Sequence, residues 1–368
     1  MQAISELFDQ TTLILPLRTT LPPSGASLLT GHNLHIHSLP EPSSHDLRRK
    51  LALLTWLPRH LPRIWNEVKQ ADAVHAPVPG DIGVIGILVA LLQRKPLFVR
   101  HCGTWAEPVT LADHLLLWLL ERIAGGRNVV LATGGGDTPP SQKNPNIHWI
   151  FSTALTEQEL ASIPPAQPWR PGQPLRLVTV GRLTAEKNVA SVIRALPILR
   201  NSSLPGGEGL GVRDISLHIL GDGEARASLE ALAAELGIVD QVTFHGNVPH
   251  DEVLGILSQS HLFVFPTRVK EGFPKAVLEA LAVGLPVIAT NVSVIPHLIK
   301  DSGCVLPDTT PKAVAQAILS LIENPENVRE MAQNARVTAQ QYTLERWRDE
   351  IGAHLEAAWG PLRANTPA

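Results

Sequence analysis

The sequence lacks several features that would point to particular protein classes. Its two cysteines, Cys102 and Cys304, lie far apart and form no Cys-x-x-Cys pair, which argues against a disulfide framework or a structural zinc site. The longest apolar run, from Ile82 to Leu92, is well short of the ~20 residues that cross a bilayer. With 31 basic and 34 acidic residues, no overall basic field favours binding to nucleic acid. These absences favour a protein of a reducing, cytoplasmic setting.

Common catalytic signatures are also missing. There is no HExxH, GxSxG or GxxxxGK[ST], so a zinc protease, an α/β-hydrolase and a P-loop nucleotidase are not indicated. No GxGxxG opens a βαβ unit, which disfavours a dinucleotide oxidoreductase. His35 and His37 share one face of a short expected strand, but their spacing suggests no third ligand, and we predict no metal site.

Short apolar runs alternate with helical stretches along the whole chain. This pattern is typical of βαβ units and a parallel sheet, so the fold class is α/β. The proline-rich stretch 164–174 separates two such series and is the best candidate for a linker. We therefore predict an N-terminal Rossmann-like domain over residues 1–165 and a second one that begins at residue 166, with a ligand-binding cleft between them.

The second series has the clearer pattern. The sequence predicts strands at 175–180, 216–220, 241–244, 262–266 and 286–290. It predicts helices at about 188–200, 224–236, 251–259, 274–283, 311–323 and 326–340.

Two cations follow the first strand of this second series. In VTVGRLTAEKN the strand ends at Gly181, and Arg182 and Lys187 fall in the loop before the next helix. Free amides at a helix start, together with two cations, form a site suited to a diphosphate. Solvated loop charges are the alternative for this motif taken alone.

Two glutamates occur in the segment FPTRVKEGFPKAVLEALAVGLPVIAT. Glu271 is expected in a loop, and Glu279 inside a helix that begins near Pro274, a residue suited to the first helical position. Glu279 could accept two hydroxyl hydrogen bonds, as a ribose diol offers. Two surface carboxylates are the alternative for this pair taken alone.

Taken together and in this order, the GRLxxxK motif, Gly221-Asp-Gly223, the two glutamates and Gly284-Leu-Pro-Val-Ile-Ala resemble the retaining GT-B glycosyltransferases, specifically glycosyltransferase family 4 (glycosyl transferases group 1). The resemblance is close over about 165–360 and loose before that. It implies a GT-B fold with two Rossmann-like domains facing a central cleft. It also implies that the donor domain ends near residue 342 and that 343–368 holds a last helix crossing back to the first domain, followed by a tail.

The resemblance also implies roles for individual residues. Arg182 and Lys187, in the loop after Gly181, would hold the donor diphosphate, and Glu279 the ribose. Glu271 and the amides of Gly272 and Phe273 would address the donor sugar. Gly221 and Gly223 would allow close backbone approach, and Gly246 would begin a segment flanking the base. In FVRHCGTW, His101 matches the strand-end histidine of the family and would contact the donor sugar or phosphate; a core histidine is the alternative.

Two departures from the family pattern affect these expectations. The glycine pair and glutamate usual after the PVIAT strand are replaced by Val292-Ser-Val-Ile-Pro-His297, which leaves contacts from those amides open. The N-terminus begins as if at the end of the family's first helix, so we predict that the N-terminal domain lacks its first βα unit.

These features predict a hexosyl-type glycosyltransferase for glycan, glycolipid or polysaccharide synthesis. It would move a sugar from a nucleotide-diphosphate-sugar donor to a glycan or lipid-linked acceptor hydroxyl, with retention of configuration. Because no Asp-x-Asp is present, we expect no metal, and the donor is a substrate rather than a cofactor. A GT-B sugar-nucleotide epimerase and a non-catalytic glycosyltransferase-like subunit are alternatives.

The basic, amphipathic stretch 47–65 could place the protein at the inner face of an anionic membrane as a peripheral protein. An ordinary domain helix with snorkelling arginines is the alternative, and we expect Pro58 and Pro62 to interrupt any long helix there.

Overall fold

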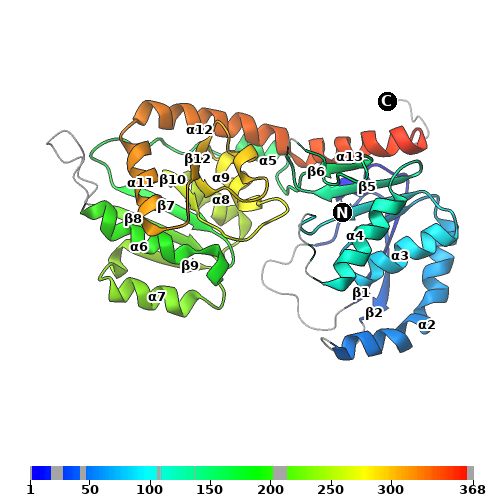
Figure 1. Ribbon diagram of the computed structural model, residues 1–368. Helices are drawn as coiled ribbons and strands as arrows, with labels where there is room; N and C mark the ends of the chain where they lie inside the picture. Colours follow the sequence, from blue (N-terminus) through cyan, green and yellow to red (C-terminus); the bar gives the residue numbers. More distant parts are fainter. Residues whose placement is uncertain are drawn as a thin grey trace. The chain divides into compact units, whose positions relative to one another are not determined.

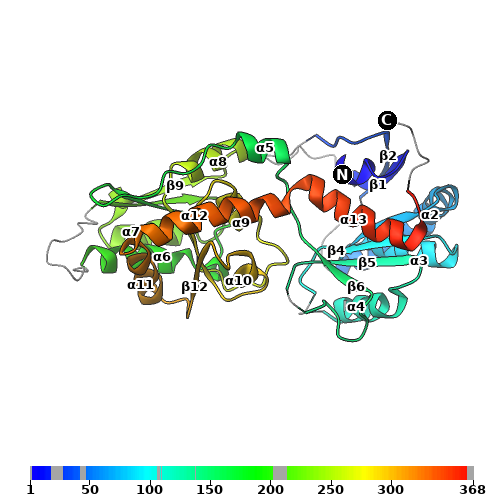
Figure 2. The same cartoon turned by 90° about the horizontal axis from the view of Figure 1, so that it is seen from above.

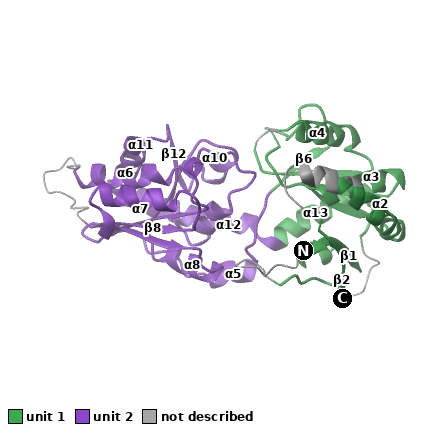
Figure 3. Cartoon of the chain, turned by 90° about the horizontal axis from the view of Figure 1, so that it is seen from below, with its two compact units in different colours: residues 1–150, 345–368 green, residues 151–344 purple. Residues whose placement is uncertain are grey.

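A computed structural model describes residues 2–17, 28–41, 47–105, 108, 110–136, 138–201 and 214–362. The chain forms two compact units, one of residues 1–150 and 345–368 and the other of residues 151–344 (Figure 3). The division after Ile150 precedes the proline-rich stretch 164–174. Residues 151–163 belong to the second unit because they pack there: Leu155 accepts a hydrogen bond from the Leu344 amide at 2.8 Å.

The unit of residues 151–344 contains one six-stranded, all-parallel sheet, with the strands in the order β12-β11-β10-β7-β8-β9 (Figure 1). The first strand in sequence, β7, therefore lies in the middle, beside β10. The strands are β7 (Leu175–Val180), β8 (Ile215–Leu220), β9 (Val242–Gly246), β10 (Leu262–Phe265), β11 (Val287–Thr290) and β12 (Gly303–Leu306).

Helices cover both faces of this sheet. Their apolar sides build a core in which Val192, Leu217 and Ile318 are fully buried, and α12 packs against α9 (Figure 2). The helices are α5 (Glu157–Ser162), α6 (Val189–Arg200), α7 (Arg226–Glu235), α8 (His250–Ser258), α9 (Lys275–Ala282), α10 (Ile295–Leu298), α11 (Pro311–Ile322) and α12 (Pro325–Ala339), with short 3-10 turns η1 (Ala185–Lys187), η2 (Val239–Gln241) and η3 (Gln340–Tyr342).

The strands of the other unit form two separate parallel sheets. In the described residues, β1 and β2 pair with each other, and β3 to β6 form a four-stranded sheet in sequence order. The elements are α1 (Gln2–Ser5), β1 (Thr11–Leu17), β2 (Leu34–Pro40), α2 (Leu47–Gln70), β3 (Val74–Val78), α3 (Asp81–Leu92), β4 (Leu97–His101), α4 (Leu111–Ile123), β5 (Asn128–Thr133), β6 (Ile147–Ile150) and α13 (Leu344–Trp359).

The last helix, α13, packs within this first unit. Its Arg348 pairs with Glu6 at 2.8 Å. His354 stacks on His148 of β6, and the Trp359 indole N–H donates to the Arg127 carbonyl at 2.9 Å. The final helix thus joins the N-terminal strands after the chain has completed the second unit.

One sequence expectation in this unit is wrong. The α2 helix is continuous from Leu47 to Gln70 although Pro58 and Pro62 lie inside it. Each proline removes an intrahelical hydrogen bond, a loss of roughly 3 kcal/mol, but Trp56 and Ile64 on the same helix are buried and hold it in place. The side chains of residues 48–50, on which the expected membrane contact depends, lie outside the described part of the structure. No helix in the described ranges is both long and apolar enough to cross a bilayer.

Candidate functional site

The expected donor-side residues gather where the strand order of the second unit reverses. Strands β7 and β10 are parallel neighbours, with Leu177 opposite Leu262, but the chain continues from them toward opposite edges of the sheet. In doubly wound sheets, ligands bind outside the carboxyl ends of the two strands at such a switch point. The loop after β7 carries Arg182 and Lys187, and the loop after β10 carries Glu271.

The loop after β7 is held by an asparagine that the sequence analysis missed. Asn188 adopts a left-handed conformation, with φ 55°, between η1 and α6. Its buried side-chain amide donates to the Ser191 hydroxyl at 3.1 Å and to the Thr309 carbonyl at 3.0 Å. Asparagine tolerates this conformation better than most residues do, which is the signal that could have marked it. Asn188 thus fixes the backbone next to Lys187.

The glycines after β8 are explained first by backbone packing. A Cβ on Gly221 would lie 2.1 Å from the Gly181 carbonyl oxygen, and one on Gly223 would lie 2.4 Å from that of Leu183. The Leu183 amide donates to the Asp222 carbonyl at 3.0 Å. In the structure, the loop after β7 therefore packs against these glycines. Their contact with a donor stays a prediction.

Gly246 closes the same corner at the end of β9. Its carbonyl accepts a hydrogen bond from the Gly221 amide at 2.7 Å, and its φ of 69° lies in the left-handed region that favours glycine. The loops after β7, β8 and β9 thus form one connected backbone surface.

Lys187 and Glu271 form an ion pair that joins the two switch-point loops. The Lys187 ammonium contacts the Glu271 carboxylate, and both side chains are largely buried. The ammonium also lies 5.1 Å from the ring centroid of Phe265 in β10, a second residue that the sequence analysis missed. Burial, and then the nearby positive charge of Arg182, lower the pKa of Lys187. An anion that binds nearby would therefore stabilise the charged form of the Lys187 ammonium group.

The Glu271 loop is tied down along its length. The Arg268 amide donates to the Glu186 carbonyl at 2.8 Å, and the buried Thr290 hydroxyl donates to the Thr267 carbonyl at 2.6 Å. Ser293, from the loop after β11, donates its hydroxyl to the Glu271 carbonyl at 2.5 Å. Contacts from the loop after β7, from the end of β11 and from the loop after β11 therefore hold the segment that carries the Glu271 carboxylate.

Glu279 lies on α9 and is nearly buried. Burial raises the pKa of its carboxyl group, while the neighbouring His250 and Lys275 lower that pKa. The His250 Nδ1 is 3.5 Å from the Glu279 Oε1. A buried carboxylate beside two basic residues is suited to accept hydrogen bonds from neutral donors such as hydroxyl groups.

The start of α9 differs slightly from the expectation. The helix begins at Lys275, and Pro274 is the residue before it. Gly272 and Phe273 precede this helix, whose first amide groups have no intrahelical acceptor. The Phe273 ring is buried 6.2 Å from the ring centroid of Phe151, so its backbone rather than its ring can meet a ligand.

A small recess opens at this junction. Gly181, Arg182, Lys187, Leu220 and Phe265 are among the residues that line it. It lies beside the exposed Arg182 and the Lys187 ammonium. This recess joins the loop after β7 to the end of β10 within the second unit.

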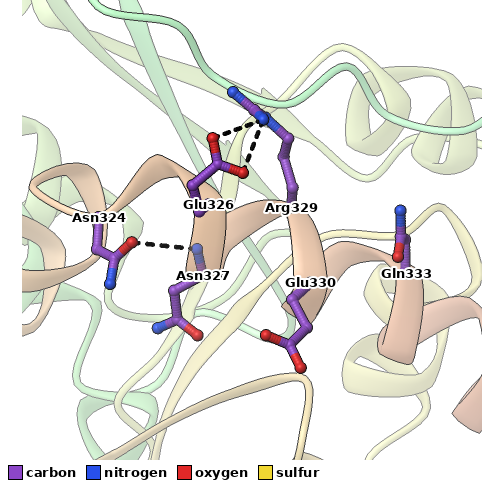
Figure 4. Close-up of a pocket in the computed structure, with 6 residues that line it drawn as sticks. All are labelled: Asn324, Glu326, Asn327, Arg329, Glu330 and Gln333. Atoms are coloured by element: carbon purple, nitrogen blue, oxygen red, sulfur yellow. Dashed lines mark hydrogen bonds and ion pairs between the residues drawn. The ribbon is translucent and has the colours of Figure 1, made fainter.

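A second hollow lies on the surface of α12 and carries no such chemistry. Figure 4 shows its six polar residues, all from α12 or the residue before it. Arg329 is already paired with both oxygens of Glu326, at 2.8 and 2.9 Å, and Asn324 caps the helix through the Asn327 amide. We assign this hollow no role.

His101 lies in the first unit, at the carboxyl end of β4. Its ring is buried, its Nδ1 is 3.2 Å from the Gly103 carbonyl oxygen, and Trp105 packs edge-on at 5.2 Å between ring centroids. Burial lowers the pKa of His101, and the Gly103 carbonyl partly opposes this effect. The imidazole is therefore neutral at pH 7, and its role at a donor stays a prediction.

Comparison with known families finds a match in the second half of the chain. Residues 165–338 match the family model described as Glycosyl transferases group 1. The match includes all the candidate residues except His101.

Curated relatives agree with this match over the same part of the chain. An α-D-kanosaminyltransferase of Streptomyces kanamyceticus is 33% identical over 175 residues, which are 47% of this chain and 43% of the relative. An amylovoran biosynthesis glycosyltransferase of Erwinia amylovora is 33% identical over 163 residues, 42% of this chain and 38% of the relative. The matched part thus spans less than half the length of these relatives.

Solved structures resemble nearly the whole chain. Anabaena Alr3699/HepE in complex with UDP and glucose superposes with a TM-score of 0.64 at 15% identity, covering 89% of this chain and 87% of that one. The lipopolysaccharide-biosynthesis glycosyltransferase WaaG gives a TM-score of 0.57 at 19% identity, covering 91% and 89%. The GT-B fold expected from the sequence is therefore confirmed.

Proposed function

We propose that this protein is a glycosyltransferase that moves a sugar from a nucleotide-diphosphate-sugar donor to a hydroxyl group of a glycan or lipid-linked acceptor. The observation that carries the proposal is the placement of Arg182, Lys187 and Glu271 at the switch point between β7 and β10. The family match of residues 165–338 and the polysaccharide-synthesis name of one relative support it.

In the proposed reaction, the bond between the sugar anomeric carbon and the β-phosphate oxygen breaks, and a bond to the acceptor oxygen forms. The leaving nucleoside diphosphate keeps the electron pair of the broken bond and gains negative charge, and the proton of the acceptor hydroxyl passes to this leaving group. Arg182 and Lys187 would stabilise that charge, because preorganised cations act most strongly where charge develops. Lys187, which pairs with Glu271 in the structure, would exchange that carboxylate for the diphosphate.

The remaining donor contacts follow from the same arrangement. Glu279 would accept hydrogen bonds from the ribose hydroxyls, and Glu271, released from Lys187, would face the donor sugar. Gly272 and Phe273 would offer their amides at the start of α9. His101, neutral and at a strand end, would contact the donor from the first unit.

Two finer features belong to this proposal. We propose that the configuration at the anomeric carbon is retained and that no metal ion is required, since Arg182 and Lys187 would supply positive charge to the diphosphate. The NMR coupling constant of the product's anomeric proton reports the first feature. Turnover in excess chelator reports the second. A cytoplasmic location with peripheral membrane contact stays a prediction.

The experiment that tests the proposal is nucleotide binding by Lys187→Ala. Loss of one charge-assisted contact of about 1.5 to 3 kcal/mol should weaken UDP or GDP binding roughly 10- to 100-fold. Thermal-shift titration of the wild-type protein with UDP, GDP, UDP-glucose and GDP-mannose first identifies the base, because a ligand stabilises the protein it binds.

Lys300→Ala is the matched control, since Lys300 is an exposed lysine of the same unit. It should bind nucleotide like the wild type. Unchanged nucleotide affinity in Lys187→Ala would contradict the diphosphate site. Nucleotide binding without sugar transfer to any acceptor would favour a non-catalytic subunit, and an isomerised donor sugar would favour an epimerase.

A further inference from the structure

Ser293 holds an unusual backbone conformation in the loop between β11 and α10. Its φ is 54°, in the left-handed region where the Cβ of an L-residue is crowded. Glycine adopts this conformation without that crowding. Ser293 lies in the segment 292–297, where the sequence departs from the glycine pair of the family it resembles. A serine in such a position suggests that its hydroxyl group has a task.

The hydroxyl has one clear task in the structure. It donates a hydrogen bond to the backbone carbonyl of Glu271, with 2.5 Å between the two oxygens. The two residues follow neighbouring strands, β11 and β10, so the bond crosses from one loop to the next. Ser293 is exposed, and an exposed hydrogen bond adds little to the stability of a fold. Its effect is therefore local, on the position of Glu271.

Other contacts fix the beginning of the Glu271 loop. Thr290 holds the Thr267 carbonyl at 2.6 Å, and Glu186 accepts from the Arg268 amide at 2.8 Å. Glu271 itself makes the Lys187 ion pair through its side chain and accepts the Ser293 hydrogen bond through its backbone carbonyl. If a diphosphate displaced the Glu271 carboxylate from Lys187, the hydrogen bond from Ser293 to the Glu271 backbone would remain.

We propose that Ser293 is a positioning residue for Glu271. Its hydroxyl fixes the Glu271 backbone, so that the carboxylate remains aimed at the donor sugar after Lys187 has turned to the diphosphate. This inference rests on the proposed function. It adds that the site distinguishes a nucleotide sugar from the bare nucleoside diphosphate. Ser293 strengthens the binding of a nucleotide sugar without strengthening the binding of the bare nucleoside diphosphate.

The test is Ser293→Gly, which removes the hydroxyl and at the same time relieves the left-handed strain. We expect its melting temperature to equal or exceed that of the wild type. We expect its affinity for the nucleotide sugar, UDP-glucose or GDP-mannose as the wild type selects, to fall about 3- to 10-fold. The affinity for UDP or GDP should stay within about twofold. A merely structural role would move stability and both affinities in the same direction.

Three companion variants separate the causes. Ser293→Ala keeps the strain and loses the hydroxyl, so it should lose the same sugar-nucleotide affinity without gaining stability. Ser293→Asn suits the left-handed conformation and supplies an amide donor, so it should recover part of the affinity. Arg94→Gly relieves a φ of 55° at an exposed position of the other unit and should change neither affinity.

Hydrogen exchange gives a readout that needs no ligand. Amides of residues 269–273 should exchange faster in Ser293→Gly, although that variant is no less stable overall. Unchanged exchange there, or an unchanged ratio of sugar-nucleotide to nucleotide affinity in a protein that binds both, would overturn the role of Ser293 and leave the proposed function standing. A wild-type protein that binds none of the four nucleotides would overturn both.

Discussion

The two units of the chain assemble parallel strands in different ways. In residues 151–344, six strands form one sheet in which the first strand lies centrally, and all four residues of its neighbour β10 are buried. In the described part of residues 1–150, β1 and β2 form their own pair, and most residues of β1 are partly or fully exposed. The four-stranded sheet there runs in sequence order and has no point of reversal.

This difference accounts for where the site chemistry lies. A reversal of strand order places two loops from distant parts of the chain side by side. In the second unit it brings Lys187 to Glu271, with Phe265 beneath the ammonium. In the first unit, the candidate residue His101 contacts Gly103, just beyond its own strand, and Trp105.

Among the substitutions considered, Gly221→Ala is predicted to cause the largest loss in the free energy of unfolding of the second unit. The added methyl group would lie 2.1 Å from the Gly181 carbonyl oxygen at a φ of 125°, so the β7 and β8 loops must separate. We expect a loss of about 3 kcal/mol or more in the free energy of unfolding of this unit. Hydrogen exchange measured by mass spectrometry would show the loss in residues 151–344 and little change in 1–150.

Gly237→Ala is the control for this effect. Gly237 has a φ of 64° and no neighbouring atom within 4 Å of an added Cβ, so only backbone strain should appear, about 1 kcal/mol. Equal losses in the two variants would show that the Gly181–Gly221 contact does not hold the loops together.

The first unit should be sensitive to acid through His75. Burial, and then the charge of Arg100, lower the pKa of His75 from 6.5 to about 3, so the folded unit holds this ring neutral, stacked on Phe98. The unfolded chain takes up a proton below pH 6.5. Stability from this group is therefore complete above pH 6.5 and falls toward pH 3, by at most about 1.4 kcal/mol per pH unit.

His75→Phe should flatten this dependence in the first unit only. The second unit has its own partly buried histidine, His261, whose pKa is lowered to about 4 by burial and Arg176. His261→Gln should therefore flatten the acid dependence of residues 151–344 instead. Unfolding free energies of the two units at pH 4 to 8, from hydrogen exchange, check both; a parent-like pH slope in both variants would refute the assignment.

The strands of the second unit were largely predictable, because each is a buried apolar run flanked by turns. The expected range 175–180 coincides with β7, and 262–266 differs from β10 by one residue. Strand β12 was missed because Gly303–Leu306 begins with a glycine and contains an exposed Val305, so it lacks the fully buried apolar run of β10 and β11. Its conformation comes from pairing with β11, which local pattern cannot show.

The site was predictable in its residue types and not in its contacts. The resemblance pointed to Lys187 and Glu271, but their ion pair depends on the strand order, which brings together loops distant in sequence. The sequence showed a departure at 292–297 without singling out Ser293, whose bond to Glu271 becomes visible only in three dimensions. Similarly, the glycines after β8 suggested ligand approach, while the structure places protein backbone against them.

The smallest effect on stability is predicted for Glu279→Gln. This variant tests whether Glu279 serves ligand binding rather than the stability of the fold. Burial raises the pKa of the Glu279 carboxyl group. An acid whose folded pKa is raised stabilises the fold at low pH, and that stability is lost as pH rises from about 4.5 through the folded pKa. At pH 7 the ionised carboxylate therefore lowers the free energy of unfolding, and replacing Glu279 with glutamine should stabilise the second unit by roughly 0.5 to 1 kcal/mol.

The same substitution should weaken nucleotide binding, because an amide presents one acceptor oxygen to a ribose diol in place of two. The matched variant is His250→Gln, which removes the nearby basic group and should lower the stability of the second unit at pH 7. Denaturant midpoints and UDP or GDP titrations on both variants check the pair of effects. If Glu279→Gln gained stability and kept full nucleotide affinity, the buried carboxylate would have no part in ribose binding. If Glu279→Gln instead gained stability and lost nucleotide affinity, the Glu279 charge would destabilise the fold but contribute to ligand binding.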